Sequence, residues 1–303
     1  MTLIECVPNF SEGRDLKKIN IIADYITKAA NIILLGKESG ADVNRSVFTF
    51  VGTKEEMFKA ACAAVDIATD LIDMSAQKGK HFRIGALDVC PFIPLKNATM
   101  QDSILLAQKT AEYAGKKGVP AYLYGKAASS LQRQSLAFIR KGQYESLPEK
   151  LSTLPPDYGP KEFNAQVQKT GAFCFGARDF LIAYNINLKT KDLELAKQIA
   201  KTLRAEIPYI KTTAWFIKEY DLCQVSINIE DYKKAPILLV FNKCKDIAKL
   251  FETEAFSSEL IGFAPQDAFC QNAEDLDKII KELGLDYLAP FNKKEHILPS
   301  ELL

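Results

Sequence analysis

Short apolar runs alternate with longer helical patterns along the first half of the chain, and this alternation limits the possible folds more than any other feature. Strands are expected where β-branched and aromatic residues cluster, and helices where apolar residues recur every three to four positions. In order, the elements begin β-α-β-β-α-β, which is the ferredoxin-like order. The predicted strands are residues 3–7, 32–35, 46–51, 89–93 and 121–124, and the predicted helices are residues 15–30, 53–72 and 102–116.

The same order of elements returns from about residue 180. The predicted strands there are 180–188, 212–218, 224–229 and a run near Leu260, and the predicted helices are 191–204, 236–251 and 274–283, the last closed by Gly284 in a left-handed cap. We therefore predict an α+β protein of two ferredoxin-like α/β halves, residues 1–179 and 180–303, each a sheet with helices on one face. Residues 147–169 are rich in Pro, Gly, Lys and Gln, which predicts a connector or binding loop rather than a core element.

The composition excludes several classes of partner. With 39 basic and 38 acidic residues, the chain lacks the charge excess that is typical of nucleic-acid-binding proteins. No apolar stretch approaches the ~20 residues of a membrane-spanning helix, and the N-terminus enters a strand-like run without a signal pattern. The seven cysteines show no two-residue spacing, and only two histidines are present, so we expect no metal site. We predict a cytoplasmic protein.

The two histidines lie in different surroundings. His81 lies in a cationic loop bounded by Gly79 and Gly85 that leads into an apolar strand. Catalytic groups are often found on such loops, and an imidazole exchanges protons near neutral pH. The alternative for His81 is a ring that only hydrogen-bonds a backbone carbonyl. His296 lies in a charged C-terminal segment and is expected to be solvated.

Seven segments carry a resemblance to a known family: ECVPNFSEG (5–13), NRSV (44–47), HFRIGALDVCPF (81–92), GAFCFGAR (171–178), LIAYNINL (181–188), QVS (224–226) and LGLDYLAPF (283–291). They extend from near the first residue to near the last. The chain resembles the glutamate formimidoyltransferases, the folate-dependent enzymes of histidine breakdown. The resemblance implies a stand-alone enzyme that moves a formimidoyl group from N-formimidoyl-L-glutamate to N5 of tetrahydrofolate. It also implies tetrahydrofolate as a co-substrate, no metal, and a homodimer.

The chemistry of this transfer requires a group that can both accept and return a proton. N5 must lose a proton as it attacks the amidine carbon, and the departing glutamate nitrogen must gain one, so a single imidazole could serve both steps. His81 aligns with the catalytic histidine of the family. A carboxylate beside the ring would fix its tautomer; the family places an acidic residue at Glu38, and Asp42 is a second choice. The alternative is that either acid belongs to a turn.

Both substrates are anionic, so cations near His81 are candidate ligands for their carboxylates. Lys80, Arg83, Arg45 and Arg178 are the candidates, and arginine suits a carboxylate because its planar fork can bond both oxygens. The alternative is structural ion pairing with acids such as Asp88 or Asp179. The folate-contacting stretch of the family falls on Gly159, Pro160, Lys161, Glu162, Phe163, Asn164, Ala165, Gln166, Val167, Gln168, Lys169, Thr170 and Gly171, for which the alternative is a linker. Within it, the amides of Asn164, Gln166 and Gln168 could recognise the pterin.

Three features depart from the family pattern. Phe82 replaces the usual proline after the catalytic histidine, Glu38 replaces an aspartate, and residues 161–170 form a longer segment without the usual Trp-Gly pair. The last departure leaves two further functions open. One is an enzyme that acts on a related one-carbon folate, 5-formyltetrahydrofolate, and the other is an inactive folate-binding protein.

Overall fold

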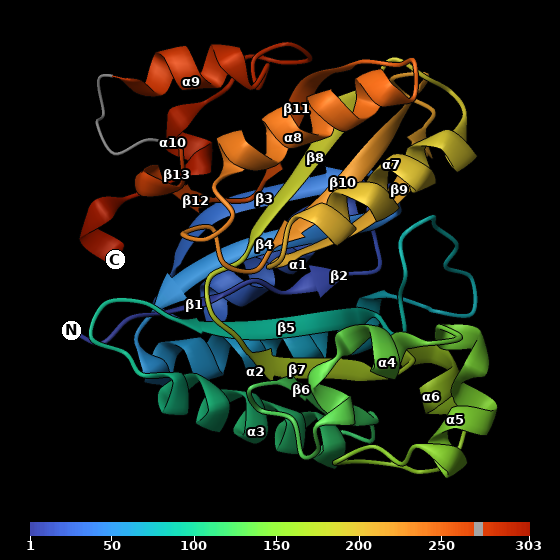
Figure 1. The fold of residues 1–303 in the computed structure, drawn as a ribbon. Coiled ribbons are helices and arrows are strands. Elements are labelled where there is room, and N and C mark those ends of the chain that lie inside the picture. Colours follow the sequence, from blue (N-terminus) through green and yellow to red (C-terminus); the bar gives the residue numbers. More distant parts are fainter. Residues whose placement is uncertain (270–274) are drawn as a thin grey trace. The chain divides into compact units, whose positions relative to one another are not determined.

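The computed structural model describes residues 1–269 and 275–303 and divides the chain into two units, Met1–Arg178 and Asp179–Leu303. Both units combine sheets with helices, which confirms the α+β class (Figure 1). The predicted start of the last helix at residue 274 lies outside the described residues, as does Cys270. None of the helices in the described ranges is long and apolar enough to cross a membrane.

A mixed sheet organises the first unit. Two short strands, β1 and β2, both pair with β4 on one side and with β5 on the other, so they form one interrupted central strand. β3 pairs with the outer edge of β4, and β7 and β6 continue the sheet beyond β5 in parallel. The strands are β1 (Ile4–Cys6), β2 (Asn9–Phe10), β3 (Ile33–Gly40), β4 (Arg45–Gly52), β5 (Leu87–Pro94), β6 (Ala121–Gly125) and β7 (Phe173–Ala177).

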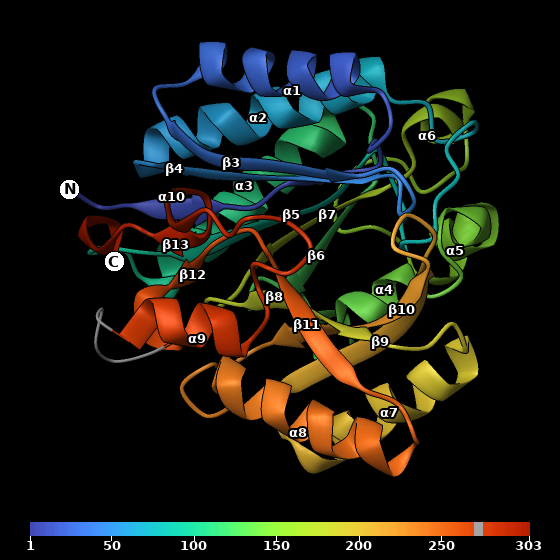
Figure 2. The same ribbon diagram turned by 90° about the horizontal axis from the view of Figure 1, so that it is seen from above.

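Three long helices cover one face of this sheet: α1 (Leu16–Ala29), α2 (Lys54–Leu71) and α3 (Met100–Lys116). Figure 2 shows α1 and α2 along one side of β3 and β4. The apolar stripe of α1, with Ile19, Ile22 and Ile26, packs in the same core as Phe48 and Phe50 of β4. Because side chains alternate along a strand, the residues between these phenylalanines point to the opposite face.

The opposite face is also covered at its β5–β7–β6 end. Tyr122 and Cys174 form a second small core there with residues of three short helices, α4 (Leu136–Arg140), α5 (Leu147–Thr153) and α6 (Ala165–Thr170). The prediction of helices on one face only is therefore wrong for this unit, and residues 147–169 are not merely a connector. Leu147 and Leu151 are fully buried, because their spacing of four places both on one side of α5.

The second unit is built on a four-stranded antiparallel sheet in the order β11-β8-β10-β9, with α7 and α8 on one face (Figure 2). Gly284, with φ +60°, follows α9 in the predicted left-handed conformation. The elements are β8 (Ile182–Leu188), α7 (Leu193–Glu206), β9 (Ile210–Ile217), β10 (Leu222–Ile229), α8 (Ile237–Leu250), β11 (Ala255–Ile261), β12 (Ala264–Pro265), α9 (Leu276–Glu282), α10 (Lys293–His296) and β13 (Ile297–Leu298).

Candidate active site

The face of the first sheet that points away from α1–α3 carries a group of polar side chains. Glu38 of β3 pairs with Val47 of β4, which in turn pairs with Asn9 of β2. Directly paired residues point to the same face, and Arg45 lies two positions from Val47. Glu38, Asn9 and Arg45 therefore share this face. Residues 37–40 belong to β3, so the suggestion that Glu38 lies in a turn is wrong.

Asp88 of β5 is the centre of this group. Its carboxylate is fully buried, and its Oδ2 accepts hydrogen bonds from Nη1 of Arg45 at 2.6 Å and from Nη1 of Arg140 at 2.9 Å. Its Oδ1 accepts from the backbone N–H of Ile84 at 2.8 Å. Burial alone would raise the pKa of Asp88, but the charges of Arg45 and Arg140 hold it below its usual value. The carboxylate is therefore ionised at neutral pH.

The same two arginines connect Asp88 to other parts of the site, Arg140 to the backbone beside His81 and Arg45 to Asn9. Nη1 of Arg140 also donates to the carbonyl of Phe82 at 3.1 Å, and Nε of Arg45 donates to Oδ1 of Asn9 at 3.0 Å. Together with the bond from Ile84, these contacts fix the loop that follows His81 against β5, β4 and β2.

His81 is half-buried, and its Nδ1 lies 2.7 Å from the carbonyl oxygen of Phe82. A carbonyl can only accept, so this contact requires the proton on Nδ1 and leaves the lone pair on Nε2. Burial and the nearby charges of Arg45 and Arg140 lower the pKa of His81 to about 3. The ring is therefore neutral at pH 7. The backbone hydrogen bond foreseen as an alternative role is present, and it sets the tautomer that a proton acceptor at Nε2 requires.

Besides Arg45, which pairs with Asp88, two more of the predicted cationic ligands make ion pairs within the first unit. Nζ of Lys80 lies 3.1 Å from Oδ2 of Asp42. The guanidinium of Arg83 donates to both carboxylate oxygens of Glu145, at 2.9 and 2.5 Å, and its other N–H groups donate to Gln77 and Gln143. All five donors of Arg83 are thus used, and these contacts favour the structural alternative for this residue.

Sequence reasoning overlooked Glu5 and Arg140. Glu5 lies in the middle of β1 and is 3% exposed, and among the described residues nothing donates a hydrogen bond to its carboxylate. Burial raises its pKa to about 7, although the charge of Arg178 opposes that rise. A charged residue between the apolar neighbours Ile4 and Cys6 was a signal that could have identified it. Arg140 lies in a polar segment that gives no such signal.

The predicted folate segment is held firmly to the first unit. Oδ1 of Asn164 accepts from the backbone N–H of Val167 and caps α6, and Nε2 of Gln166 donates to the carbonyl of Lys117 at 2.5 Å. All three amide residues that were expected to meet a pterin are exposed, but the side chains of Asn164 and Gln166 have internal partners. The hydroxyl of Tyr144 donates to the Gln168 carbonyl at 2.6 Å.

The end of this segment packs against the His81 loop. Gly171 has φ +67° and forms a bridge with Gly85, and a Cβ at Gly171 would lie only 2.3 Å from the carbonyl oxygen of Ile84. Only glycine fits such an approach without displacement of the backbone. The structure thus brings the predicted folate stretch and the predicted catalytic loop together at one point.

The second sheet carries a row of polar side chains on the face away from α7 and α8. Trp215 donates to Oε1 of Gln224 at 3.0 Å, Gln224 donates to Oδ1 of Asn187 at 2.7 Å, and Asn187 donates to the hydroxyl of Ser257 at 2.9 Å. Gln224 also donates to Oε2 of Glu259 at 2.6 Å. Asn187 and Ser257 are fully buried, so these bonds satisfy groups that would otherwise be costly to bury.

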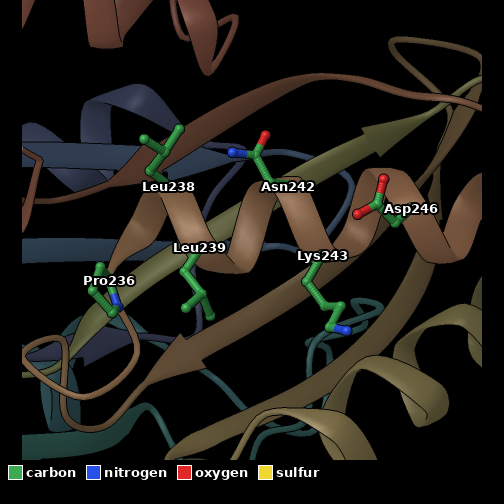
Figure 3. Close-up of a pocket in the computed structure, with 6 residues that line it drawn as sticks. All are labelled: Pro236, Leu238, Leu239, Asn242, Lys243 and Asp246. Carbon is green, nitrogen blue, oxygen red and sulfur yellow. The ribbon is translucent and has the colours of Figure 1, made fainter.

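A surface cavity lies on α8 of the second unit, and none of the predicted site residues lines it. Figure 3 shows its lining side chains along this helix, where Lys243 also forms a 2.7 Å ion pair with Glu206 of α7. The lining residues are Pro236, Leu238, Leu239, Asn242, Lys243 and Asp246. It contains neither a histidine nor an arginine, and it is not a candidate for the transfer site. Among the described residues, His, Cys, Asp and Glu form no group of three or more that could hold a metal.

Comparisons with known proteins agree on one family. The model of the formiminotransferase domain, N-terminal subdomain, matches residues 3–178, and that of the formiminotransferase domain matches residues 183–302. The glutamate formimidoyltransferase of Thermoplasma acidophilum is 40% identical over 90% of this chain and 92% of its own length, and that of Streptococcus pyogenes is 36% identical over the same shares. The formimidoyltransferase-cyclodeaminase of Gallus gallus is 38% identical over 98% of this chain, which spans 59% of that relative. The chain belongs to the formiminotransferase domain family.

Proposed function

We propose that this protein transfers the formimidoyl group of N-formimidoyl-L-glutamate to N5 of tetrahydrofolate, as a step of histidine degradation. Tetrahydrofolate is the co-substrate, and the reaction as proposed uses no metal. Family membership supports the reaction class, since relatives that match most of their length are glutamate formimidoyltransferases. The observation that carries the proposal is the position of His81, whose tautomer is set by Phe82 in a loop that meets the Gly171 segment.

The proposed mechanism gives His81 both proton transfers. N5 attacks the amidine carbon and forms a new N–C bond, the C=N π pair moves onto the imino nitrogen, and Nε2 of His81 takes the N5 proton. The C=N bond then re-forms as the bond from that carbon to the glutamate nitrogen breaks, and His81 returns the proton to this nitrogen, so that glutamate leaves as an amine. Such acid–base catalysis contributes ~10²–10⁴-fold. Positioning of the two substrates supplies much of the remainder.

Other residues are assigned supporting roles. Glu38 is proposed to orient or stabilise the His81 ring, and its place on the polar face with Asn9 and Arg45 supports this. Arg45, Lys80 and Arg178 are proposed to attract the substrate carboxylates, whereas the five donors of Arg83 are already used within the first unit. Arg45 is the best supported, because it lies beside His81 and Asp88. Residues 159–171 are proposed to contact folate.

The domain roles are part of the same proposal. Residues 1–179 form the N-terminal subdomain with the catalytic histidine and folate segment, and residues 180–303 form the C-terminal subdomain. The strand order of each sheet supports a ferredoxin-like description, because the first strand of each β-α-β-β-α-β set lies between the third and the fourth. A cytoplasmic location and a homodimer belong to the proposal as well.

A donor panel tests the proposed reaction. The purified chain is incubated with tetrahydrofolate and N-formimidoyl-L-glutamate, and separately with 5-formyltetrahydrofolate and glutamate, and folates are identified by mass spectrometry. Formation of 5-formimidoyltetrahydrofolate in the first mixture supports the proposal. Turnover only in the second mixture would favour a formyl-folate enzyme, and folate binding without turnover in either would favour a binding protein.

A further inference from the structure

The two guanidiniums beside His81 share a single carboxylate oxygen. Nη1 of Arg45 and Nη1 of Arg140 both donate to Oδ2 of Asp88. Two positive charges thus meet one negative charge. All three groups are largely shielded from water: the side chain of Arg45 is 6% exposed, that of Arg140 is 16% exposed and that of Asp88 is 0% exposed. The cluster keeps a net charge of +1 next to a neutral imidazole.

Several N–H donors of these arginines are unused. Among the described residues, Nη2 of Arg45 and Nη2 of Arg140 make no hydrogen bond. Nε of Arg140 is buried and also has no partner. Buried donors without a partner are costly, and the N–H groups of a guanidinium bind a carboxylate more strongly than neutral donors do. The unused N–H groups of Arg45 and Arg140 and the net positive charge of their cluster with Asp88 are both suited to binding an anionic ligand.

We propose that Arg45 and Arg140 form a subsite for a carboxylate of the donor substrate, and that filling this subsite converts His81 from a weak base into an effective one. The identity of the ligand rests on the proposed function. Among the described residues, the charged groups that act on His81 include Arg45 from β4, Arg140 from α4 and Asp88 from β5. Glu38 of β3 lies on the same face of the sheet. In the loop of His81, Lys80 is paired with Asp42 and Arg83 with Glu145.

The electrostatic reason is the sign of the charge that the ligand adds. In the empty site, burial and the positive charges of Arg45 and Arg140 disfavour the imidazolium and hold the pKa of His81 at about 3. A base this weak accepts a proton poorly at neutral pH. A carboxylate bound to the same guanidiniums places a negative charge near the ring. Such a charge raises the pKa of the imidazole and increases its proton affinity by ~10- to 10³-fold. The donor substrate would thereby activate the base that acts on it, and loss of glutamate would restore the weak base.

Arg140 is the residue that distinguishes this proposal from simple charge attraction. It donates to the backbone of Phe82, whose carbonyl also accepts the bond from His81, so it acts on the loop and on the ring together. Its replacement by glutamine leaves Asp88 paired with Arg45 but removes one of the two charges that suppress protonation of His81.

Histidine-ring NMR tests the proposal directly, because the chain has only two histidines. The probe is N-formyl-L-glutamate, which keeps both carboxylates, and its uncharged diamide is the control ligand. Spectra are recorded from pH 3 to pH 8 without folate, with His81→Asn for assignment and His296 as the internal reference. We expect the dicarboxylate to raise the proton affinity of His81 by ~10-fold or more, whereas the diamide and the His296 signals show no change. In Arg140→Gln, we expect a higher proton affinity in the empty protein and a smaller response to the ligand.

An unchanged His81 titration at saturating dicarboxylate would overturn the proposal, and so would an equal response in Arg140→Gln. If Arg140→Gln does not fold, the comparison between the dicarboxylate and the diamide in the wild-type protein still decides the matter. The outcome is independent of the proposed function, since the measurement needs no turnover. A shift of the His81 titration without transfer activity would support the subsite and contradict the proposed transfer reaction. Transfer activity without that shift would support the reaction and contradict the subsite.

Discussion

At the level of single side chains, Asp88 connects the parts of the site that are distant in sequence. Its carboxylate binds Arg45, 43 residues earlier, and Arg140, 52 residues later, and it also accepts from the N–H of Ile84 in the loop that follows His81. A buried charge with partners on two elements and a loop is costly to disturb, because each partner is left without compensation.

Substitution of Asp88 by asparagine should therefore destabilise the first unit strongly. The change leaves Arg45 and Arg140 as buried charges with no ionised partner, and we expect a loss of ~3–5 kcal/mol in the free energy of unfolding. Chemical denaturation measures this loss. The matched control is Asp246→Asn, which removes one partner of an exposed 3.8 Å ion pair with Lys249 and should change stability little. Equal effects of the two substitutions would contradict the role given to Asp88.

Glu5 predicts a pH-dependent stability. The pKa of Glu5 is raised by burial from 4.5 to about 7, so the folded state holds this proton more tightly than the unfolded state does. The stability that comes from the neutral carboxyl is fully present below pH 4.5 and is lost as pH rises towards 7. Glu5→Gln removes this dependence, and its stability relative to wild type should grow by roughly 2–3 kcal/mol between pH 5 and pH 8. A difference that does not vary with pH would contradict this account of Glu5.

At the level of elements, the close contact between residues 84–85 and 171–172 joins the predicted folate segment to the loop that carries His81. The backbones approach so closely that a Cβ at Gly85 would lie 2.1 Å from the carbonyl oxygen of Ala172. α6, which precedes this contact, is in turn anchored by Val167 in the small core on that face of the sheet. The position of His81 therefore depends on how the end of the folate segment packs.

Gly171→Ala should disturb both stability and activity. The new Cβ would meet the carbonyl of Ile84 at 2.3 Å, at a residue whose φ of +67° already disfavours alanine. We expect a loss of about 2 kcal/mol or more in unfolding free energy, together with a reduced transfer rate. The control is Gly118→Ala, where φ is +79° but the nearest atom is the flexible Oε1 of Gln166. If the two variants have equal stability, the backbone contact is not the cause.

At the level of the whole chain, much of the fold could be predicted because long, strongly patterned elements carry their own signal. The predicted strands 46–51, 89–93, 121–124 and 224–229 fall inside β4, β5, β6 and β10. β7 was missed, although it lies between β5 and β6, because Phe173–Ala177 is short and contains a glycine. α4 and α5 were missed for the same reason of length, and α5 also lies in a segment rich in proline and glycine.

The candidate site could be predicted only in part. His81 and Arg45 were proposed as site residues because an unusual histidine loop and a family motif mark them in the sequence. Arg140 could not be found, because its importance arises from a contact with Asp88 that forms only when distant segments fold together. Arg83 was expected to bind substrate, but its five donors are satisfied by residues 77, 143 and 145, which pattern reasoning could not place beside it.

The central claim is that His81 moves the protons of formimidoyl transfer, and a single-turnover experiment tests it most directly. Excess protein is mixed with N-formimidoyl-L-glutamate and tetrahydrofolate, and product is quantified over time for wild type, His81→Ala and the control His296→Ala. His296 stacks on Phe291 in the second unit and has no proposed part in the reaction. We expect His81→Ala to lose at least ~10²-fold in rate, while His296→Ala transfers at close to the wild-type rate. A folded His81→Ala protein that transfers at the wild-type rate would contradict the account.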